Sequence, residues 1–190
     1  MSTEDTADPR TSEDERPAVD PLALRVALSR FPTGVCVVTT LAPGGQPIGL
    51  TVNSFASVSL DPPLVLWSLR RSSPSLQAFQ SARGFAINVL AADQHELSSR
   101  FARPITDKFA DVRLASKDGE DPLIERAAAH FSCASWRHYD GGDHVIFIGR
   151  VLRFTISSAM PLAFVGGRYA TVRERTDAPS VEELWPIPFW

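Results

Sequence analysis

The chain has 190 residues, of which 44% are apolar, and a formal net charge of −3. This length fits one domain with a sizeable core, and no apolar run approaches the roughly 18 residues of a membrane span. The near-neutral charge argues against a broad nucleic-acid-binding surface. Because the N-terminus lacks the basic and then apolar order of a secretory signal, we expect a soluble cytoplasmic protein.

The start of the chain differs in composition from the rest. The first 20 residues hold seven acidic and two basic side chains, and we expect residues 1–19 to form a disordered acidic tail. A helix is predicted from Asp20, a candidate N-cap, with Pro21 in its first turn and an apolar stripe through Leu22 and Val26. This helix would begin a single domain that spans residues 20–175.

Strands dominate this predicted domain. Apolar and β-branched runs bounded by Gly, Pro and Asp predict strands at 34–41, 64–69, 84–90, 127–139 and 144–156, one or two strands at 48–60, and a last strand and a loop within 161–172. Short helices are predicted at 73–82 and 92–102. Strands and helices do not alternate, so we expect a mainly β fold, an antiparallel barrel with small peripheral helices. The apolar tail 176–190 should dock on the body or on a partner subunit.

The stretch from Gly49 to Leu69, GLTVNSFASVSLDPPLVLWSL, combines strand-like spacing with many small polar side chains. Polar Thr51, Asn53 and Ser57 alternate with apolar residues, and residues 51–60 carry no charge. Solvent-facing strands usually carry long charged side chains. We interpret this face as the wall of a site for a planar heterocycle, since such a ligand needs small uncharged donors and acceptors. A polar face that simply meets water is the alternative.

A second polar segment, SLRRSSPSLQAF, follows the strand at 64–69. Arg70 and Arg71 precede several serines, among them Ser73 and Ser75, where a short helix is predicted to begin. Free N–H groups, hydroxyls and a guanidinium together suit a phosphate. A polar loop with a serine cap is the alternative.

The sequence DGGD, residues 140–143, predicts a tight hairpin turn that places Asp143 and His144 at its mouth. On its own, such a histidine would more often be a surface residue than a catalytic one. Cys36 and Cys133 lie in apolar strand-like runs and are interpreted as buried thiols. The sequence has no CxxC pair or Cys/His cluster, so no metal site is predicted.

Taken in order, these segments resemble the short-chain flavin reductase family, the reductase components of two-component flavin-dependent monooxygenases. The resemblance rests on FPTGVCVVTT, TVNSFASVSLDPPL, RRSSPSLQAFQ, FAINVLAADQHELSSRFA, GGDHVIFIGRV and PLAFVGGRY, and it covers about Leu24 to Tyr169. It implies an FMN-binding split β-barrel, usually a homodimer. It also implies reduction of FMN or FAD by NADH or NADPH, and a partner monooxygenase that receives the reduced flavin.

The resemblance further implies roles for individual residues. The segment along the isoalloxazine ring and ribityl chain corresponds to Thr51, Val52, Asn53, Ser54, Ala56 and Ser57. The positions around the flavin phosphate correspond to Arg71, Ser73 and Ser75. The catalytic histidine beside the nicotinamide corresponds to His144, with Asp143 before it, and an aromatic position near the pyridine nucleotide corresponds to Tyr169. The pair Arg100 and Phe101 also matches the family, and we expect this arginine to support the fold.

Three functions are alternatives to this interpretation. A pyridoxamine-phosphate-oxidase-like enzyme would need several basic residues for a substrate phosphate, and the sequence clearly places only Arg70 and Arg71. A non-enzymatic flavin carrier would not need the sequence Gly142-Asp143-His144. A purely structural interaction protein would have no use for the uncharged polar strand.

Overall fold

A computed structural model describes residues 19–116, 119–173 and 177. Its helices are α1 (Pro21–Leu28), α2 (Leu76–Ser81) and α3 (His95–Ala102). Its strands are β1 (Thr33–Gly34), β2 (Cys36–Leu41), β3 (Pro47–Val52), β4 (Ala56–Leu60), β5 (Pro63–Arg70), β6 (Gly84–Val89), β7 (Ala129–Gly141), β8 (His144–Ile156), β9 (Leu162–Val165) and β10 (Arg168–Thr171). The tails expected at 1–19 and 176–190 lie almost wholly outside the described residues.

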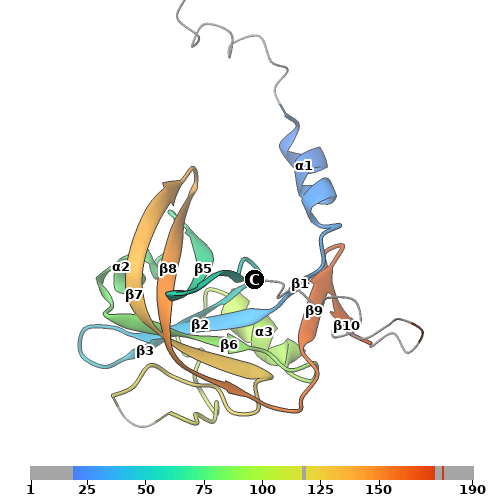
Figure 1. Cartoon of the computed structure of the whole chain (residues 1–190). Helices are drawn as coiled ribbons and strands as arrows, with labels where there is room; N and C mark the ends of the chain where they lie inside the picture. The colour runs from blue at the N-terminus through green and yellow to red at the C-terminus, as the bar shows by residue number, and fades with distance from the viewer. Residues whose placement is uncertain (1–18, 117–118, 174–176, 178–190) are drawn as a thin grey trace, which may run out of the picture.

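Seven strands form one antiparallel sheet in the order β3-β2-β6-β7-β8-β5-β4, and β1, β9 and β10 form a second sheet. The large sheet curls so that its two edge strands, β3 and β4, are joined by only residues 53–55 (Figure 1). Long strands β7 and β8 form the hairpin that rises from the body, and they turn through Gly142 at φ 69°. The predicted mainly β fold is confirmed.

A serine hydroxyl links the two ends of the curled sheet. The Ser54 Oγ accepts a hydrogen bond from the Ser68 backbone N–H at 3.0 Å and donates to the Ser68 carbonyl at 3.3 Å. One hydroxyl therefore satisfies both backbone groups of a β5 residue, as a paired strand residue would. This contact fixes the segment between β3 and β4 against β5.

The core has two parts because β2 is buried on both faces. Cys36 and Val38 pack into a cluster around Trp67, whereas Val35 and Val37 pack into a second cluster. The Trp67 ring stacks on Phe147 with a centroid separation of 4.6 Å and meets Phe79 and Phe85 edge-on. A strand that is covered on both faces needs consecutive apolar residues, and the start of β2 provides them with Cys36, Val37 and Val38.

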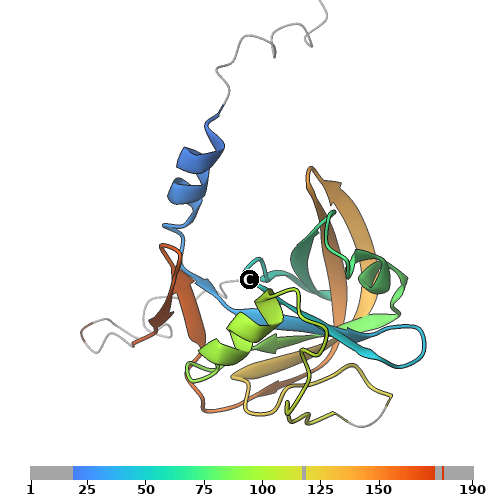
Figure 2. The same ribbon diagram turned by 180° about the vertical axis from the view of Figure 1, so that it is seen from behind.

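Helix α3 packs against β3 and β2, behind the sheet in the view of Figure 1 and in front of it in Figure 2. Helix α1 begins as predicted, since the Asp20 carboxylate accepts a hydrogen bond from the Leu22 N–H. It then projects away from the sheets and contains no buried residue (Figures 1 and 2). None of the helices among the described residues is long and apolar enough to cross a membrane.

The stretch 48–60, for which the sequence predicts one or two strands, forms two strands separated by a break at 53–55, so its two halves face different surroundings. Two other details differ from the sequence-based expectations. Residues 161–172 form two strands rather than one, because Gly166 and Gly167 both adopt positive φ and reverse the chain. The N-cap of α2 is Ser75, two residues later than the expected Ser73, whose hydroxyl instead accepts a hydrogen bond from the Ser75 N–H.

Candidate flavin site

A cavity of about 450 Å³ opens between the end of β3, the segment before α2, the end of α3 and the loop that follows α3. Its volume lies within the range of small-molecule sites. The cavity is lined by Leu50, Thr51, Val52, Asn53, Ser54, Ser68, Leu69, Arg70, Ser72, Ser73, Pro74, Ser75, Phe101, Ala102, Arg103, Pro104, Lys108 and His144. A hollow of about 560 Å³ beside Thr40, Arg83 and Asp121 is larger but holds none of the predicted site residues.

Seven of the predicted residues meet at this cavity, although they come from three separate segments. They are Thr51, Val52, Asn53, Ser54, Ser73, Ser75 and His144. The break between β3 and β4 gives residues 53 and 54 non-strand geometry, so that both can line the cavity together with Thr51 and Val52. Of the uncharged wall inferred from the sequence, the first part, residues 51–54, lines the cavity.

Five predicted residues lie outside the lining. Ala56 and Ser57 are exposed on the edge strand β4. The Arg71 side chain turns to the β7–β8 hairpin, where it pairs with Asp140 at 2.6 Å. Tyr169, on β10, donates from its hydroxyl to the Ser98 Oγ at 2.9 Å. Asp143 lies beside the cavity through its contact with His144.

Helix α3 supports the wall from behind. The Thr51 hydroxyl donates to the Ser98 carbonyl at 2.7 Å, and Ser98 also receives the hydrogen bond from Tyr169. One turn of α3 is thus tied to both β3 and β10. The Arg100 guanidinium donates to the Ala110 carbonyl at 2.6 Å, which agrees with the expected role of this arginine in supporting the fold.

Three cationic side chains that sequence reasoning did not select, Arg70, Arg103 and Lys108, line the cavity. The Lys108 Nζ donates to the Phe101 carbonyl at 2.9 Å and to the Gly49 carbonyl at 3.3 Å. Burial lowers the pKa of Lys108, because desolvation disfavours its charged form. No carboxylate occurs among the described residues that line the cavity, so an anion would meet positive charge there.

His144 stands at the first position of β8, and its Nδ1 lies 2.7 Å from the Asp143 carboxylate. A carboxylate accepts hydrogen bonds, so Nδ1 carries a proton, and whenever the ring is neutral Nε2 is its acceptor nitrogen. The hydrogen bond with His144, and then the charge of the imidazolium, lower the pKa of Asp143. Asp143 therefore orients the histidine that faces the cavity.

Lys108 could not be selected from the sequence, because it is a single lysine in an irregular loop. It lies 59 positions from Gly49, and only the packing of α3 and its following loop on β3 brings the two together. Arg70 was visible in the sequence as one of two adjacent arginines. β5 ends at Arg70 and Arg71 begins the turn after it, and only the structure shows that Arg70 is the arginine that lines the cavity.

Both cysteines are buried, as predicted. Burial raises the pKa of each thiol to about 12. No cluster of metal-ligating side chains occurs among the described residues.

Several known proteins are similar to this chain over most of its length. FMN reductase (NADH) SmoA of Agrobacterium fabrum is 50% identical over 147 residues, which cover 77% of this chain and 83% of that protein. The reductase component of the flavin-dependent trigonelline monooxygenase of Acinetobacter baylyi is 44% identical over 158 residues. That match covers 83% of this chain but 51% of the relative, so the chain spans about half the length of that protein.

A solved structure shares the fold over its whole length. The NADH:FAD oxidoreductase SgcE6 of Streptomyces globisporus, in complex with NAD and FAD fragments, is 39% identical with a TM-score of 0.76. The match covers 86% of this chain and 100% of that one. The flavin reductase like domain matches residues 28–173, which include every residue of the cavity. The chain therefore belongs to the flavin reductase-like domain family.

Proposed function

We propose that the protein reduces FMN or FAD with a reduced pyridine nucleotide and supplies the reduced flavin to a flavin-dependent monooxygenase. The observation that carries this proposal is the cavity, which joins an uncharged wall at Thr51, Asn53 and Ser54 to cationic side chains and to His144. This set of groups fits a flavin, because a neutral heterocycle and an anionic phosphate need different partners.

A bound flavin would supply the redox chemistry by accepting a hydride from the nicotinamide. The residues of the chain would bind the flavin and orient the nicotinamide. Asn53 and Thr51 offer uncharged donors along the ring, and neutral donors can stabilise negative charge that develops on reduction. Arg70, Arg103 and Lys108 would hold the phosphate together with Ser73 and Ser75. His144 would orient the nicotinamide through its Nε2.

The names of two relatives, FMN reductase (NADH) and NADH:FAD oxidoreductase, favour NADH as the hydride donor. The name of the Acinetobacter baylyi relative, a reductase component, favours an oxygenase partner. Because NADH is an intracellular metabolite, a cytoplasmic location is part of the proposal.

Kinetics on the purified protein test this function. NADH should be consumed when FMN or FAD is added, and pyridoxine phosphate should cause no turnover. Consumption with pyridoxine phosphate would favour the oxidase-like alternative. Flavin binding without NADH consumption would favour a carrier, and absence of flavin binding would overturn the proposal.

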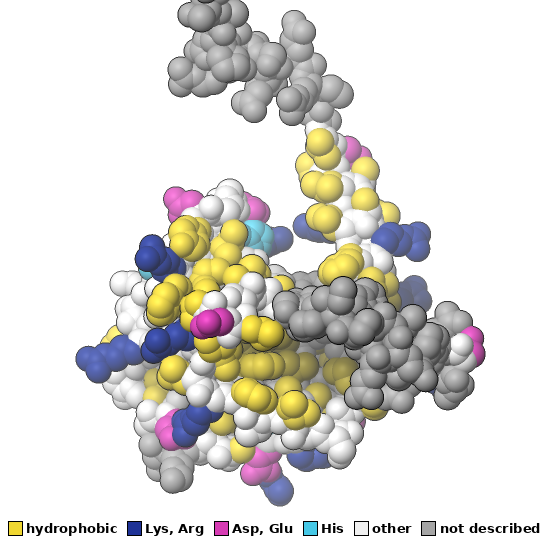
Figure 3. Space-filling model, viewed as in Figure 1, with side chains coloured by type: hydrophobic (Ala, Val, Ile, Leu, Met, Phe, Trp, Pro, Cys, Tyr) yellow, Lys and Arg dark blue, Asp and Glu magenta, His cyan; other side chains and the backbone are white. Residues whose placement is uncertain are grey.

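We also propose a homodimer, which two exposed apolar surfaces support. Phe154 and Ile156 at the end of β8 are 63% and 77% exposed, yet Phe154 stacks on Phe131 of the core-packed sheet face at 6.4 Å. Apolar side chains also cover α1, the helix that projects from the body in Figure 3. The exposed apolar residues of α1 and its end are Leu22, Leu24, Val26, Leu28 and Phe31.

Apolar surface continuous with a core is typical of an interface rather than of free surface. Light scattering should give twice the mass of the chain, and Phe154→Asp with Ile156→Asp should shift the protein towards monomer. Arg153→Asp on the same strand serves as the control. A monomer of the unmodified protein at micromolar concentration would contradict the homodimer.

A further inference from the structure

Arg71 makes three contacts with the turn of the β7–β8 hairpin. Its Nε donates to the Gly142 carbonyl at 2.9 Å, and its guanidinium pairs with the Asp140 carboxylate at 2.6 Å. Its backbone N–H donates to the Asp143 carbonyl at 2.9 Å. One residue at the end of β5 therefore contacts both sides of the turn, and we call these contacts the Arg71 clasp.

The clasp lies next to the histidine that faces the cavity. Arg70 and His144 are the last residue pair of the β5–β8 ladder, and Gly141 pairs with His144 across the hairpin, so no ladder pair lies beyond His144 to hold the turn. Beyond that pair the hairpin turns through Gly142, which adopts positive φ and has no side chain that could pack against β5. The contacts of Arg71 replace the missing ladder on the turn side.

We propose that Arg71 is a positioning residue for His144, and that it sets the apparent affinity for the pyridine nucleotide rather than binding the flavin phosphate. The proposal rests on the proposed function for the role of His144. Its geometric basis is that Arg71 does not line the cavity, whereas Arg70, His144 and Lys108 do. A guanidinium that is engaged with Gly142 and Asp140 is directed to the hairpin.

The two roles open to Arg71 predict different kinetics. A phosphate ligand would contribute to flavin affinity, and its loss would raise the dissociation constant for FMN. A positioning residue would leave FMN affinity unchanged and raise the Michaelis constant for NADH, because the nicotinamide meets a less ordered His144. The split between these two constants therefore separates the roles.

Three variants should raise KM for NADH by increasing amounts, in the order Asp140→Asn, Arg71→Lys and Arg71→Ala. Exposed ion pairs change equilibria by at most about fivefold, so Asp140→Asn should raise KM for NADH no more than about twofold, with the bond to Gly142 intact. Arg71→Lys keeps the charge but loses the planar fork, and an intermediate rise is expected. Arg71→Ala removes both side-chain contacts and should raise KM about fivefold to tenfold. FMN affinity should change less than about twofold in all three.

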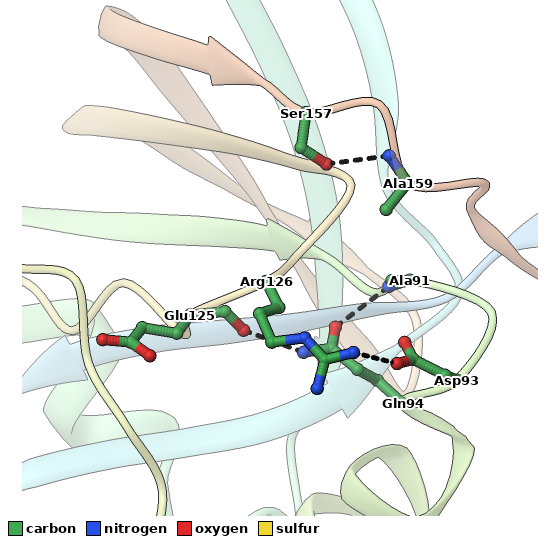
Figure 4. Close-up of polar contacts among 7 residues, drawn as sticks. All are labelled: Ala91, Asp93, Gln94, Glu125, Arg126, Ser157 and Ala159. Atoms are coloured by element: carbon green, nitrogen blue, oxygen red, sulfur yellow. Dashed lines mark hydrogen bonds and ion pairs between the residues drawn. The ribbon is translucent and has the colours of Figure 1, made fainter.

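Arg126→Ala is the matched control. It also removes an exposed arginine–aspartate pair, with Asp93, at the opposite end of the same hairpin (Figure 4). Arg126 lies just before the first residue of β7, whereas Asp140 lies next to the last residue of this 13-residue strand. This variant should leave KM for NADH and FMN affinity unchanged.

Nuclear magnetic resonance of the His144 ring provides a readout that does not depend on turnover. Arg71→Ala should shift or broaden the ring signals of His144, whereas Arg126→Ala should not. Unchanged ring signals, or a loss of FMN affinity equal to the rise in KM, would overturn the proposal. A third result would also overturn it: His144→Ala raises KM for NADH, but Arg71→Ala perturbs the ring signals of His144 and leaves KM for NADH unchanged.

Failure of the proposed function gives a different result. If His144→Ala leaves KM for NADH unchanged, the role of His144 at the nicotinamide is wrong. The ring signals then still decide whether Arg71 positions the histidine.

Discussion

Replacement of Lys108 by glutamine tests whether the cationic end of the cavity holds a phosphate. The Lys108 ammonium is partly desolvated, and a hydrogen bond between charged groups contributes about 1.5–3 kcal/mol. At about 1.4 kcal/mol for each factor of ten, the variant should bind FMN about 10-fold to 100-fold more weakly. Riboflavin has the same ring and ribityl chain without the phosphate, so its affinity should change less than about twofold.

The assay is a titration of FMN and of riboflavin, followed by the quenching of flavin fluorescence, for both proteins. Glutamine retains an N–H donor for the Phe101 and Gly49 carbonyls, so the loop should keep its place. Arg126→Gln, at the distant pair with Asp93, is the control for a lost surface charge. Equal losses for FMN and riboflavin would show that Lys108 shapes the cavity without contacting a phosphate, and no loss for FMN would refute the reasoning.

The pH dependence follows from the direction of the Lys108 pKa shift. The folded pKa lies below the ordinary 10.5, so the side chain loses its proton earlier than an exposed lysine as the pH rises. FMN affinity should therefore fall between neutral pH and 10.5, in excess of any change for riboflavin, and Lys108→Gln should abolish that excess. Without ligand, the unfolded chain binds more protons in this window, so the contribution of Lys108 to stability rises with pH.

Three further outcomes are expected. His144→Ala should raise KM for NADH about tenfold, the cost of one lost hydrogen bond, with FMN affinity retained; an unchanged KM would remove His144 from the site. Ser73→Asp should weaken FMN binding about tenfold or more by charge repulsion, and normal affinity would mean that the phosphate lies elsewhere. Cys36 and Cys133, with pKa values raised to about 12, should resist alkylation at pH 8 in the folded protein and react after denaturation. Rapid labelling of the folded chain would contradict their burial.

The sequence was sufficient for the fold because most of its signals are local. Asp20 caps α1, the turn at Gly142 joins β7 to β8, and the apolar run of β2 is buried on both faces. The boundary between β3 and β4 was less clear, since the residues of the break resemble strand residues in type. It depends on the contact of Ser54 with Ser68, which no local pattern reveals.

The candidate site could be predicted only in part, for a related reason. Thr51 and Asn53 were identified because an uncharged polar strand is unusual, and His144 because it follows a recognisable turn. Lys108 contributes charge from an irregular loop, and its position depends on packing against α3. The choice between Arg70 and Arg71 depends on where β5 ends and on the contacts of Arg71 with the β7–β8 hairpin, and the local sequence does not determine either.

The two sides of the cavity differ in how firmly they are held, and this difference has consequences for function. Thr51 and Ser54 are tied to α3 and β5 by hydrogen bonds between segments far apart in the chain, next to a buried core. His144 stands at the end of an exposed hairpin, where its side chain contacts Asp143 and the Arg71 clasp holds the adjacent turn. Local opening occurs where buried contacts are few, so the histidine side should be the more mobile. Substitutions in the hairpin should therefore alter use of the pyridine nucleotide, whereas substitutions in β3 and around Lys108 should alter flavin affinity.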